Sequence, residues 1–162
     1  MAIEKVREYF KQYGLTDKIL EFDVSSATVA LAAEALGCAP ERIAKTLSFK
    51  SDDGCILVVA AGDAKVDNSK FKAEFGIKAK MLSAEEVEEL CGHAVGGVCP
   101  FAVKETAAVY LDESLNRFAT VFPACGSSNS AIEFTIDELK KYSNFIKMVD
   151  VCKNWQNEEE QA

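Results

Sequence analysis

The chain has 162 residues, of which 49% are hydrophobic and 27% are charged. This is the length of one domain, and the composition excludes a disordered or collagen-like protein. The 18 Lys and Arg against 26 Asp and Glu give a formal net charge of −8, which argues against a DNA partner, because sequence-independent duplex binding requires the neutralisation of many phosphates.

Cap residues and glycines predict six helices along the chain. Ser26 and Asp67 are the expected caps of the second and fourth helices, and Ser83 and Thr135 open capping boxes, each with a glutamate three residues later. The expected helical ranges are 6–13, 27–36, 40–44, 68–75, 84–91 and 136–142.

Apolar runs between these helices predict six strands. Cys55–Ala61 is a continuous apolar run, which is typical of a strand buried on both faces. The other expected strands are 46–50, 77–82, 107–111, 118–122 and 131–134. Because some strands are joined by helices and others by tight turns, we expect a mixed α/β domain with a partly antiparallel sheet. It spans residues 1–153 and is followed by a polar tail over 154–162.

The chain shows neither a secretory leader nor a membrane-spanning run. Its first ten residues read MAIEKVREYF, and no stretch of about 18 consecutive apolar residues follows. We therefore expect a cytoplasmic protein without a membrane partner. The six cysteines form no C-x-x-C pair and are expected to be reduced core residues. Their spacing predicts no metal site, and no cofactor is expected.

Three segments place polar residues or glycines at the end of an apolar element. They read RIAKTL over 42–47, GHAVGGVCPF over 92–101 and FPACGSSN over 122–129. In the first, a helix passes into a strand. Paired glycines in the second allow a close backbone approach and expose N–H groups, and the proline can fix the turn after them.

These segments, in this order and at this spacing, resemble the YbaK/EbsC aminoacyl-tRNA deacylases, relatives of the editing insertion domain of bacterial prolyl-tRNA synthetases. The resemblance covers residues 24–142 and includes Lys45, the Ala-Gly-Asp sequence at 61–63, the G-x-x-x-P motif at 96–100 and the loop at 126–129. It implies the YbaK/prolyl-tRNA synthetase-associated domain fold, in which helices surround a mixed, largely antiparallel and partly barrel-like sheet.

The resemblance also implies a function, the trans-editing of mischarged tRNA. The expected reaction is hydrolysis of the ester that joins a small amino acid (Cys, Ala or similar) to tRNA, with tRNA(Pro) as the first candidate. It assigns the catalytic role to Lys45 and requires neither a metal nor a nucleophilic serine or cysteine. The expected substrate-binding residues are Thr46, Gly96, Gly97, Val98, Cys99, Pro100, Phe101, Gly126, Ser127 and Asn129.

Elementary chemistry agrees with this assignment. An aminoacyl ester is already activated, so the protein need only position it, admit water and stabilise the developing oxyanion, for which one well-aimed donor contributes roughly 2.7–4 kcal/mol. A lysine at the end of an element supplies a point charge that either anchors a phosphate or polarises the ester carbonyl.

Two alternatives remain open at this stage. His93, the only histidine, could form a nucleophilic dyad with Cys91 or Cys99. The chain could also be a non-catalytic module that binds aminoacyl-tRNA or a synthetase, because Ala102 follows Pro100-Phe101 where relatives often carry glycine.

The expected partner is the acceptor end of a mischarged tRNA. Residues 63–80 carry five lysines against three acidic residues, a local balance of +2, and could receive that end, whereas the acidic helix over 84–91 should face away. An acidic protein should bind tRNA weakly by itself, so prolyl-tRNA synthetase or an elongation factor is an expected helper.

Overall fold

The computed structural model describes residues 2–155. The tail expected over 154–162 therefore lies outside the described residues from position 156 onward. Within the described part of that range, Trp155 packs against the core. No helix among residues 2–155 has both the length and the apolar character that crossing a bilayer requires.

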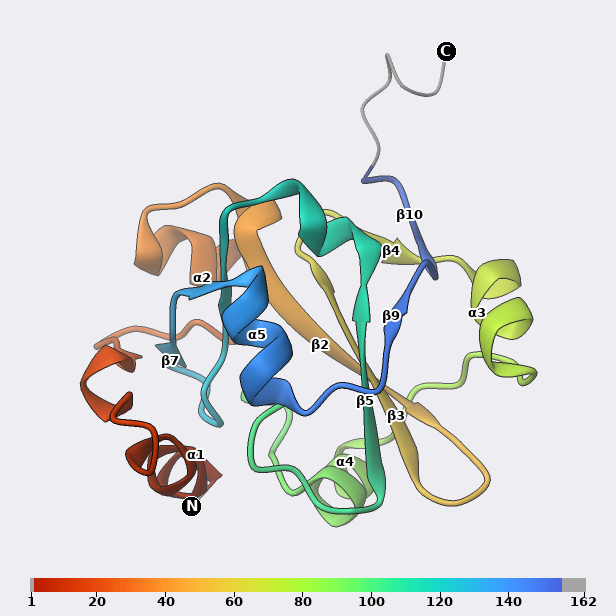
Figure 1. The fold of residues 1–162 in the computed structure, drawn as a ribbon, viewed down its shortest axis with the longest axis horizontal. Helices are drawn as coiled ribbons and strands as arrows, with labels where there is room; N and C mark the ends of the chain where they lie inside the picture. Colours follow the sequence, from red (N-terminus) through yellow and green to blue (C-terminus); the bar gives the residue numbers. More distant parts are fainter. Residues whose placement is uncertain (1, 156–162) are drawn as a thin grey trace.

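A six-stranded sheet forms the centre of the molecule (Figure 1). Its strand order is β8-β6-β2-β3-β5-β9. The bounds are Phe134–Thr135 for β8, Thr120–Pro123 for β6, Ile43–Lys50 for β2, Cys55–Ala61 for β3, Ala107–Asp112 for β5 and Met148–Val149 for β9. Every residue of β3 is buried, as its continuous apolar run predicts.

The mixed α/β fold is confirmed, but the sheet is more evenly mixed than the expected, largely antiparallel one. β2 pairs antiparallel with β3, and β6 with β8. The pairs β2·β6, β3·β5 and β5·β9 are parallel. The cause lies in the connections, because a tight turn at Gly54 joins β2 to β3, whereas a crossover through two helices separates β3 from β5.

Two small two-stranded sheets are separate from the central sheet. β1 (Leu20–Glu21) pairs with β7 (Ser130–Ala131), and β4 (Lys65–Val66) pairs with β10 (Cys152–Lys153). The strand expected over 77–82 is absent, since only an isolated bridge joins Met81 to Phe49. The strand expected over 131–134 is divided between β7 and β8.

The helices surround the sheet (Figure 1). Their bounds are Ala2–Lys11 for α1, Val29–Leu36 for α2, Asn68–Phe75 for α3, Ala84–Cys91 for α4 and Ile136–Ser143 for α5. The cap at Asp67 and both capping boxes are confirmed. The cap at Ser26 is wrong, because Thr28 caps α2, and the helix expected after Pro40 is a single 3-10 turn, Pro40–Arg42.

Aromatic side chains join α1 and α5 to the core. Phe10 of α1 is fully buried, with ring centroids 4.9 Å from Phe101 and 5.7 Å from Phe134. Tyr142 of α5 stacks on Phe134 at 5.4 Å. The amphipathic first helix is therefore part of the same hydrophobic core as the sheet.

We predict that Phe10→Ala lowers the free energy of unfolding by about 3–5 kcal/mol, because it leaves a cavity within this aromatic cluster. Urea denaturation followed by circular dichroism measures the loss. Tyr13→Ala is the matched control, since Tyr13 is 44% exposed, and it should cost about 1 kcal/mol or less. Equal losses in the two variants would contradict the burial argument.

Candidate functional site

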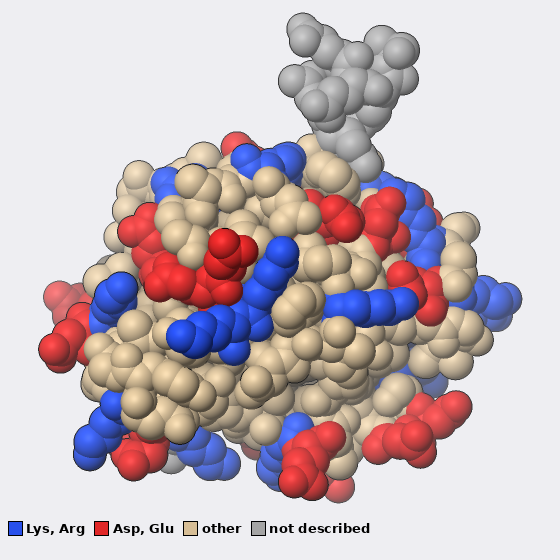
Figure 2. Space-filling view, viewed as in Figure 1, with Lys and Arg blue, Asp and Glu red and all other residues tan. Residues whose placement is uncertain are grey.

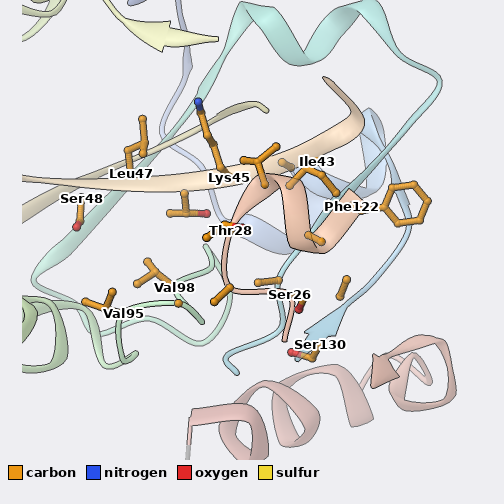
Figure 3. Close-up of a pocket in the computed structure, with 18 of the residues that line it drawn as sticks. Ser26, Thr28, Ile43, Lys45, Leu47, Ser48, Val95, Val98, Phe122 and Ser130 are labelled. Atoms are coloured by element: carbon orange, nitrogen blue, oxygen red, sulfur yellow. The ribbon is translucent and has the colours of Figure 1, made fainter. Parts of the chain in front are cut away.

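A cavity of about 330 Å³ lies between β2, α2 and the loop that follows α4 (Figure 3). This volume is within the range of small-molecule sites. The walls are apolar or hydroxyl-bearing apart from Lys45, which among residues 2–155 is the one charged residue in the lining. The main lining segments are 26–29, 43–48, 81–82 and 95–98 without Gly97.

Lys45 lies within β2, opposite Ala60 of β3. Its ammonium donates to the carbonyl oxygens of Gly62, at 3.3 Å, and Ala64. Both acceptors belong to the turn after β3. No ion pair found among residues 2–155 includes Lys45, so its positive charge is solvated by neutral carbonyls.

Burial lowers the pKa of Lys45 below the ordinary value of a lysine, while the nearby Cys152 and Asp63 act in the opposite direction. The cause is the loss of water around the charged form. A partly buried cation without a carboxylate partner retains its attraction for an anion or for an oxygen that gains negative charge.

Successive residues of β2 point to opposite sides of the strand. Figure 3 shows Lys45 and Leu47 on one side, and Ser48 on the side of Val95 and Val98. By the same alternation Thr46 shares the face of Ser48. Its buried hydroxyl has no hydrogen-bond partner among the described residues, and unsatisfied hydroxyls of this kind are available to a ligand.

Gly96 and Val98 of the G-x-x-x-P motif line the cavity, but Gly97 does not. A Cβ atom on Gly97 would lie 2.7 Å from the nitrogen of Ser127. The glycine therefore allows this loop to pack on the 126–129 loop rather than on a ligand. The Gly97 N–H donates to Ala94, whereas those of Gly96 and Val98 have no partner within residues 2–155.

The 126–129 loop lies behind the cavity wall. The Ser127 hydroxyl oxygen lies within hydrogen-bond distance of Asn129 Oδ1 and of Ser130 Oγ, at 3.0 and 2.7 Å. The Asn129 amide donates to the Phe22 carbonyl at 3.0 Å, and the Ser26 N–H donates to the Ser128 carbonyl at 2.6 Å. The loop thus holds the segment that begins the 26–29 wall, and Gly126, Ser127 and Asn129 are absent from the lining.

Cys99, Pro100 and Phe101 are also absent from the lining. Cys99 and Phe101 are completely buried, and Phe101 belongs to the aromatic cluster around Phe10. The proline therefore directs the chain from the cavity wall into the core. Of the residues expected to bind substrate, the structure brings Thr46, Gly96 and Val98 together with Lys45 at one cavity.

The Cys99 sulfur lies 3.5 Å from His93 Nε2, a contact that the sequence did not establish. Both side chains are completely buried. Burial raises the pKa of the Cys99 thiol and lowers the pKa of His93. The same Nε2 lies 2.7 Å from the Phe101 carbonyl, which can only accept, so Nε2 carries the proton and cannot take one from the thiol. The arrangement therefore favours a structural role for Cys99 and His93 in the core over a nucleophilic dyad.

The remaining cysteines are free thiols, and Cys55, Cys91, Cys125 and Cys152 are buried in the core. Within residues 2–155, no group of three or more His, Cys, Asp or Glu side chains has the arrangement of a metal site.

Acidic and basic side chains alternate across the face drawn in Figure 2, without a continuous basic band.

The lysine-rich segment over residues 63–80 forms β4, α3 and the chain after it. Figure 1 places α3 at the opposite end of the molecule from α2, and Lys70 is engaged by Asp150 and the Cys152 carbonyl. The chain returns to the cavity only at Met81 and Leu82. Contact of these lysines with tRNA stays a prediction.

Sequence reasoning missed most of the cavity wall. Ser48 was detectable, because it lies two residues after Thr46 and therefore on the same face of a strand. The 26–29 segment carries no local signal, since tertiary packing alone brings it to β2.

The fold and the cavity define a class of protein, the aminoacyl-tRNA editing domains. Residues 24–142 match the aminoacyl-tRNA editing domain family, and the chain belongs to it. The family predicted from the three segments is therefore confirmed.

Known relatives agree with this assignment. The chain is 54% identical over 157 residues to YwhH of Bacillus subtilis (strain 168), covering 96% of this chain and all of that one. It is 29% identical over 121 residues to the proline–tRNA ligase of Geobacillus sp. (strain WCH70), which corresponds to 68% of this chain and 21% of the ligase. A crystal structure described as a candidate trans-editing enzyme for prolyl tRNA synthetase superposes with a TM-score of 0.84 at 28% identity, covering 94% of this chain and 97% of that one.

Ala102 explains how the chain accommodates its departure from the expected glycine. Its φ is +53°, in the left-handed region that glycine adopts without strain. The alanine therefore retains the backbone conformation of a glycine at an energetic cost, and its side chain lies outside the cavity lining.

We predict that Ala102→Gly raises the free energy of unfolding by about 0.5–1 kcal/mol. It removes roughly 1–2 kcal/mol of left-handed strain, and the greater freedom of glycine in the unfolded chain offsets part of this gain. Chemical denaturation measures the change. Ala108→Gly, in β5, is the control and should destabilise by a similar amount. A destabilised Ala102→Gly would refute the strain argument.

Proposed function

We propose that this chain is a trans-acting deacylase that hydrolyses the ester between a small mischarged amino acid, such as Cys or Ala, and the 3′ end of a tRNA, with tRNA(Pro) as the first candidate. The observation that carries the proposal is the small cavity, whose lining within the described chain is uncharged apart from Lys45. The similarity to the ligase and to the candidate trans-editing enzyme supports the choice of tRNA(Pro).

The reaction needs few groups from the protein. Water attacks the ester carbonyl carbon, the bond to the ribose oxygen breaks, and that oxygen takes a proton, so that a free amino acid and an intact tRNA leave. The N–H groups of Gly96 and Val98, which have no hydrogen-bond partner within residues 2–155, are suited to stabilise the oxyanion. The apolar walls hold a small side chain, and the volume limits its size.

Lys45 supplies the positive charge in this proposal. As a phosphate anchor it would contribute mainly to binding, and as a carbonyl polariser it would contribute mainly to the chemical step. Kinetic constants separate the two roles, because loss of an anchor raises KM whereas loss of a transition-state contact lowers kcat.

The net negative charge of the chain limits how strongly it can bind tRNA by itself. With a net charge of −8 the chain can neutralise few phosphates, and affinity for a tRNA body depends on such contacts. We therefore infer that prolyl-tRNA synthetase or an elongation factor presents the acceptor end.

The non-catalytic alternative was based on the replacement of the expected glycine by Ala102. Because Ala102 keeps the backbone conformation of a glycine and lies outside the cavity lining, this replacement no longer favours that alternative.

We predict that Lys45→Met lowers kcat/KM for deacylation by about 100-fold or more, in line with the loss of one charge-stabilising donor. The measurement is release of amino acid from Ala-, Cys- and Ser-charged tRNA(Pro). Lys18→Met, at an exposed position, is the matched control and should act like the unmodified protein. Full activity in Lys45→Met, or no activity above background in the unmodified protein, would contradict the proposal.

A pH profile offers a second test. Because burial lowers the pKa of Lys45 from its ordinary value of 10.5, the ammonium exists below the lowered pKa and is lost as the pH rises through it. We therefore expect kcat/KM, corrected for spontaneous ester hydrolysis, to fall on the alkaline side before pH 10.5. A profile that is flat up to that pH would show that the charge of Lys45 is not required.

A further inference from the structure

The turn that holds Lys45 also contains a carboxylate. Asp63 lies between Gly62 and Ala64, whose carbonyls accept from the Lys45 ammonium. An acidic side chain in this place is the natural ion-pair partner of a half-buried lysine. The structure nevertheless pairs Asp63 with a different residue.

Arg117 takes up the Asp63 carboxylate in a bidentate ion pair. Its two terminal nitrogens lie 2.5 and 2.9 Å from the two carboxylate oxygens. Arg117 and Asp63 are 27% and 28% exposed, so water screens this pair less than a pair on the open surface. The forked geometry is the one that arginine offers and lysine does not.

Further contacts hold the guanidinium of Arg117 in place. Nε donates to the Ser114 carbonyl at 3.0 Å, and a terminal nitrogen donates to the Trp155 carbonyl at 2.9 Å. The group also lies over the rings of Phe118 and Trp155, at 4.7 and 5.2 Å. Cation–π and hydrogen-bond contacts on several sides leave Arg117 little freedom to release Asp63.

The turn itself does not depend on this ion pair for its shape. The Ala61 N–H donates to the Ser114 hydroxyl at 3.1 Å, and the Ala64 N–H donates to the Ala61 carbonyl at 3.0 Å. A Cβ on Gly62 would lie 2.0 Å from the Pro40 carbonyl oxygen, so the backbone there is closely packed. Loss of Arg117 should therefore free the carboxylate without unfolding the turn.

We propose that Arg117 is a positioning residue that holds the Asp63 carboxylate away from Lys45, so that the Lys45 ammonium stays available to the substrate. The proposal rests on the proposed function for its catalytic consequence. The claim that Arg117 keeps Asp63 from pairing with Lys45 depends only on the contacts described above. A freed Asp63 would pair with the Lys45 ammonium and neutralise its charge.

A double-mutant comparison tests the idea. Arg117→Met should lower kcat/KM by about 10-fold or more, because Asp63 then competes with the substrate for Lys45. Asp63→Asn combined with Arg117→Met should recover most of the activity, since no competing carboxylate remains. A purely structural role predicts the opposite order, with the double variant at least as impaired as the single one.

The pKa of Lys45, measured by NMR titration of its side-chain Cε, provides a readout that needs no activity. The titratable groups near Lys45 are Asp63 and Cys152. Arg117→Met should raise the pKa of Lys45 by about 1, as an opposite charge within reach does, and the double variant should reverse the rise. Lys147→Met is the control, because it removes a charge from a pair with Glu74 and should leave Lys45 unchanged.

The outcomes separate this proposal from the proposed function. An unchanged pKa of Lys45 in Arg117→Met, or no recovery in the double variant, would overturn the role of Arg117 even if the protein is a deacylase. If the protein cleaves no ester, the titration still decides the electrostatic claim. Should Arg117→Met fail to fold, Arg117→Lys keeps the charge but loses the fork, and it should give a smaller rise in the same pKa.

Discussion

A half-buried lysine with no carboxylate partner among residues 2–155 is the constraint on which the candidate site depends. The Lys45 ammonium rests on the carbonyls of Gly62 and Ala64, which are polar enough to solvate the charge but cannot neutralise it. Such an arrangement requires a rigid turn, because two carbonyls must stay aimed at one nitrogen. The close contact of Gly62 with Pro40 and the bond from Ala61 to Ser114 provide that rigidity.

The cavity beside this lysine is built in layers. The 96–98 loop forms part of its wall, the 126–129 loop supports both that wall and the segment leading to α2, and the aromatic cluster around Phe101 lies in the core behind them. Glycine at position 97 is required where the two loops meet, because any side chain would strike the backbone at Ser127. Loops supported in this way can hold backbone donors in position before a ligand arrives.

This construction suits a module that recognises the end of a long substrate. The chain corresponds to about a fifth of a proline–tRNA ligase, and its net charge is −8. In the proposed function the small cavity with its single cation binds only the aminoacyl group, because contacts with the rest of a tRNA need basic surface, and no continuous basic band lies on the face shown in Figure 2.

The sequence alone predicted the family, the fold class and several local elements. The caps at Asp67, Ser83 and Thr135 and the buried strand Cys55–Ala61 are confirmed, because a cap or an apolar run depends on neighbours within a few residues. Residues with weaker local signals were misplaced. Ser26 offers the same hydroxyl as a cap, but its hydrogen bonds to Ser128, a residue far along the chain, place it elsewhere.

Only the tertiary structure decided which residues face the cavity. The sequence does not show which of the residues from Gly96 to Phe101 face the cavity. The chain turns inward after Val98, so that Cys99 and Phe101 are core residues. The proximity of Asp63 to Arg117 and the contact of Cys99 with His93 are likewise products of the fold. Local sequence determines helix ends and strand character through short-range bonding, whereas the orientation of a side chain toward a site depends on how distant segments pack together.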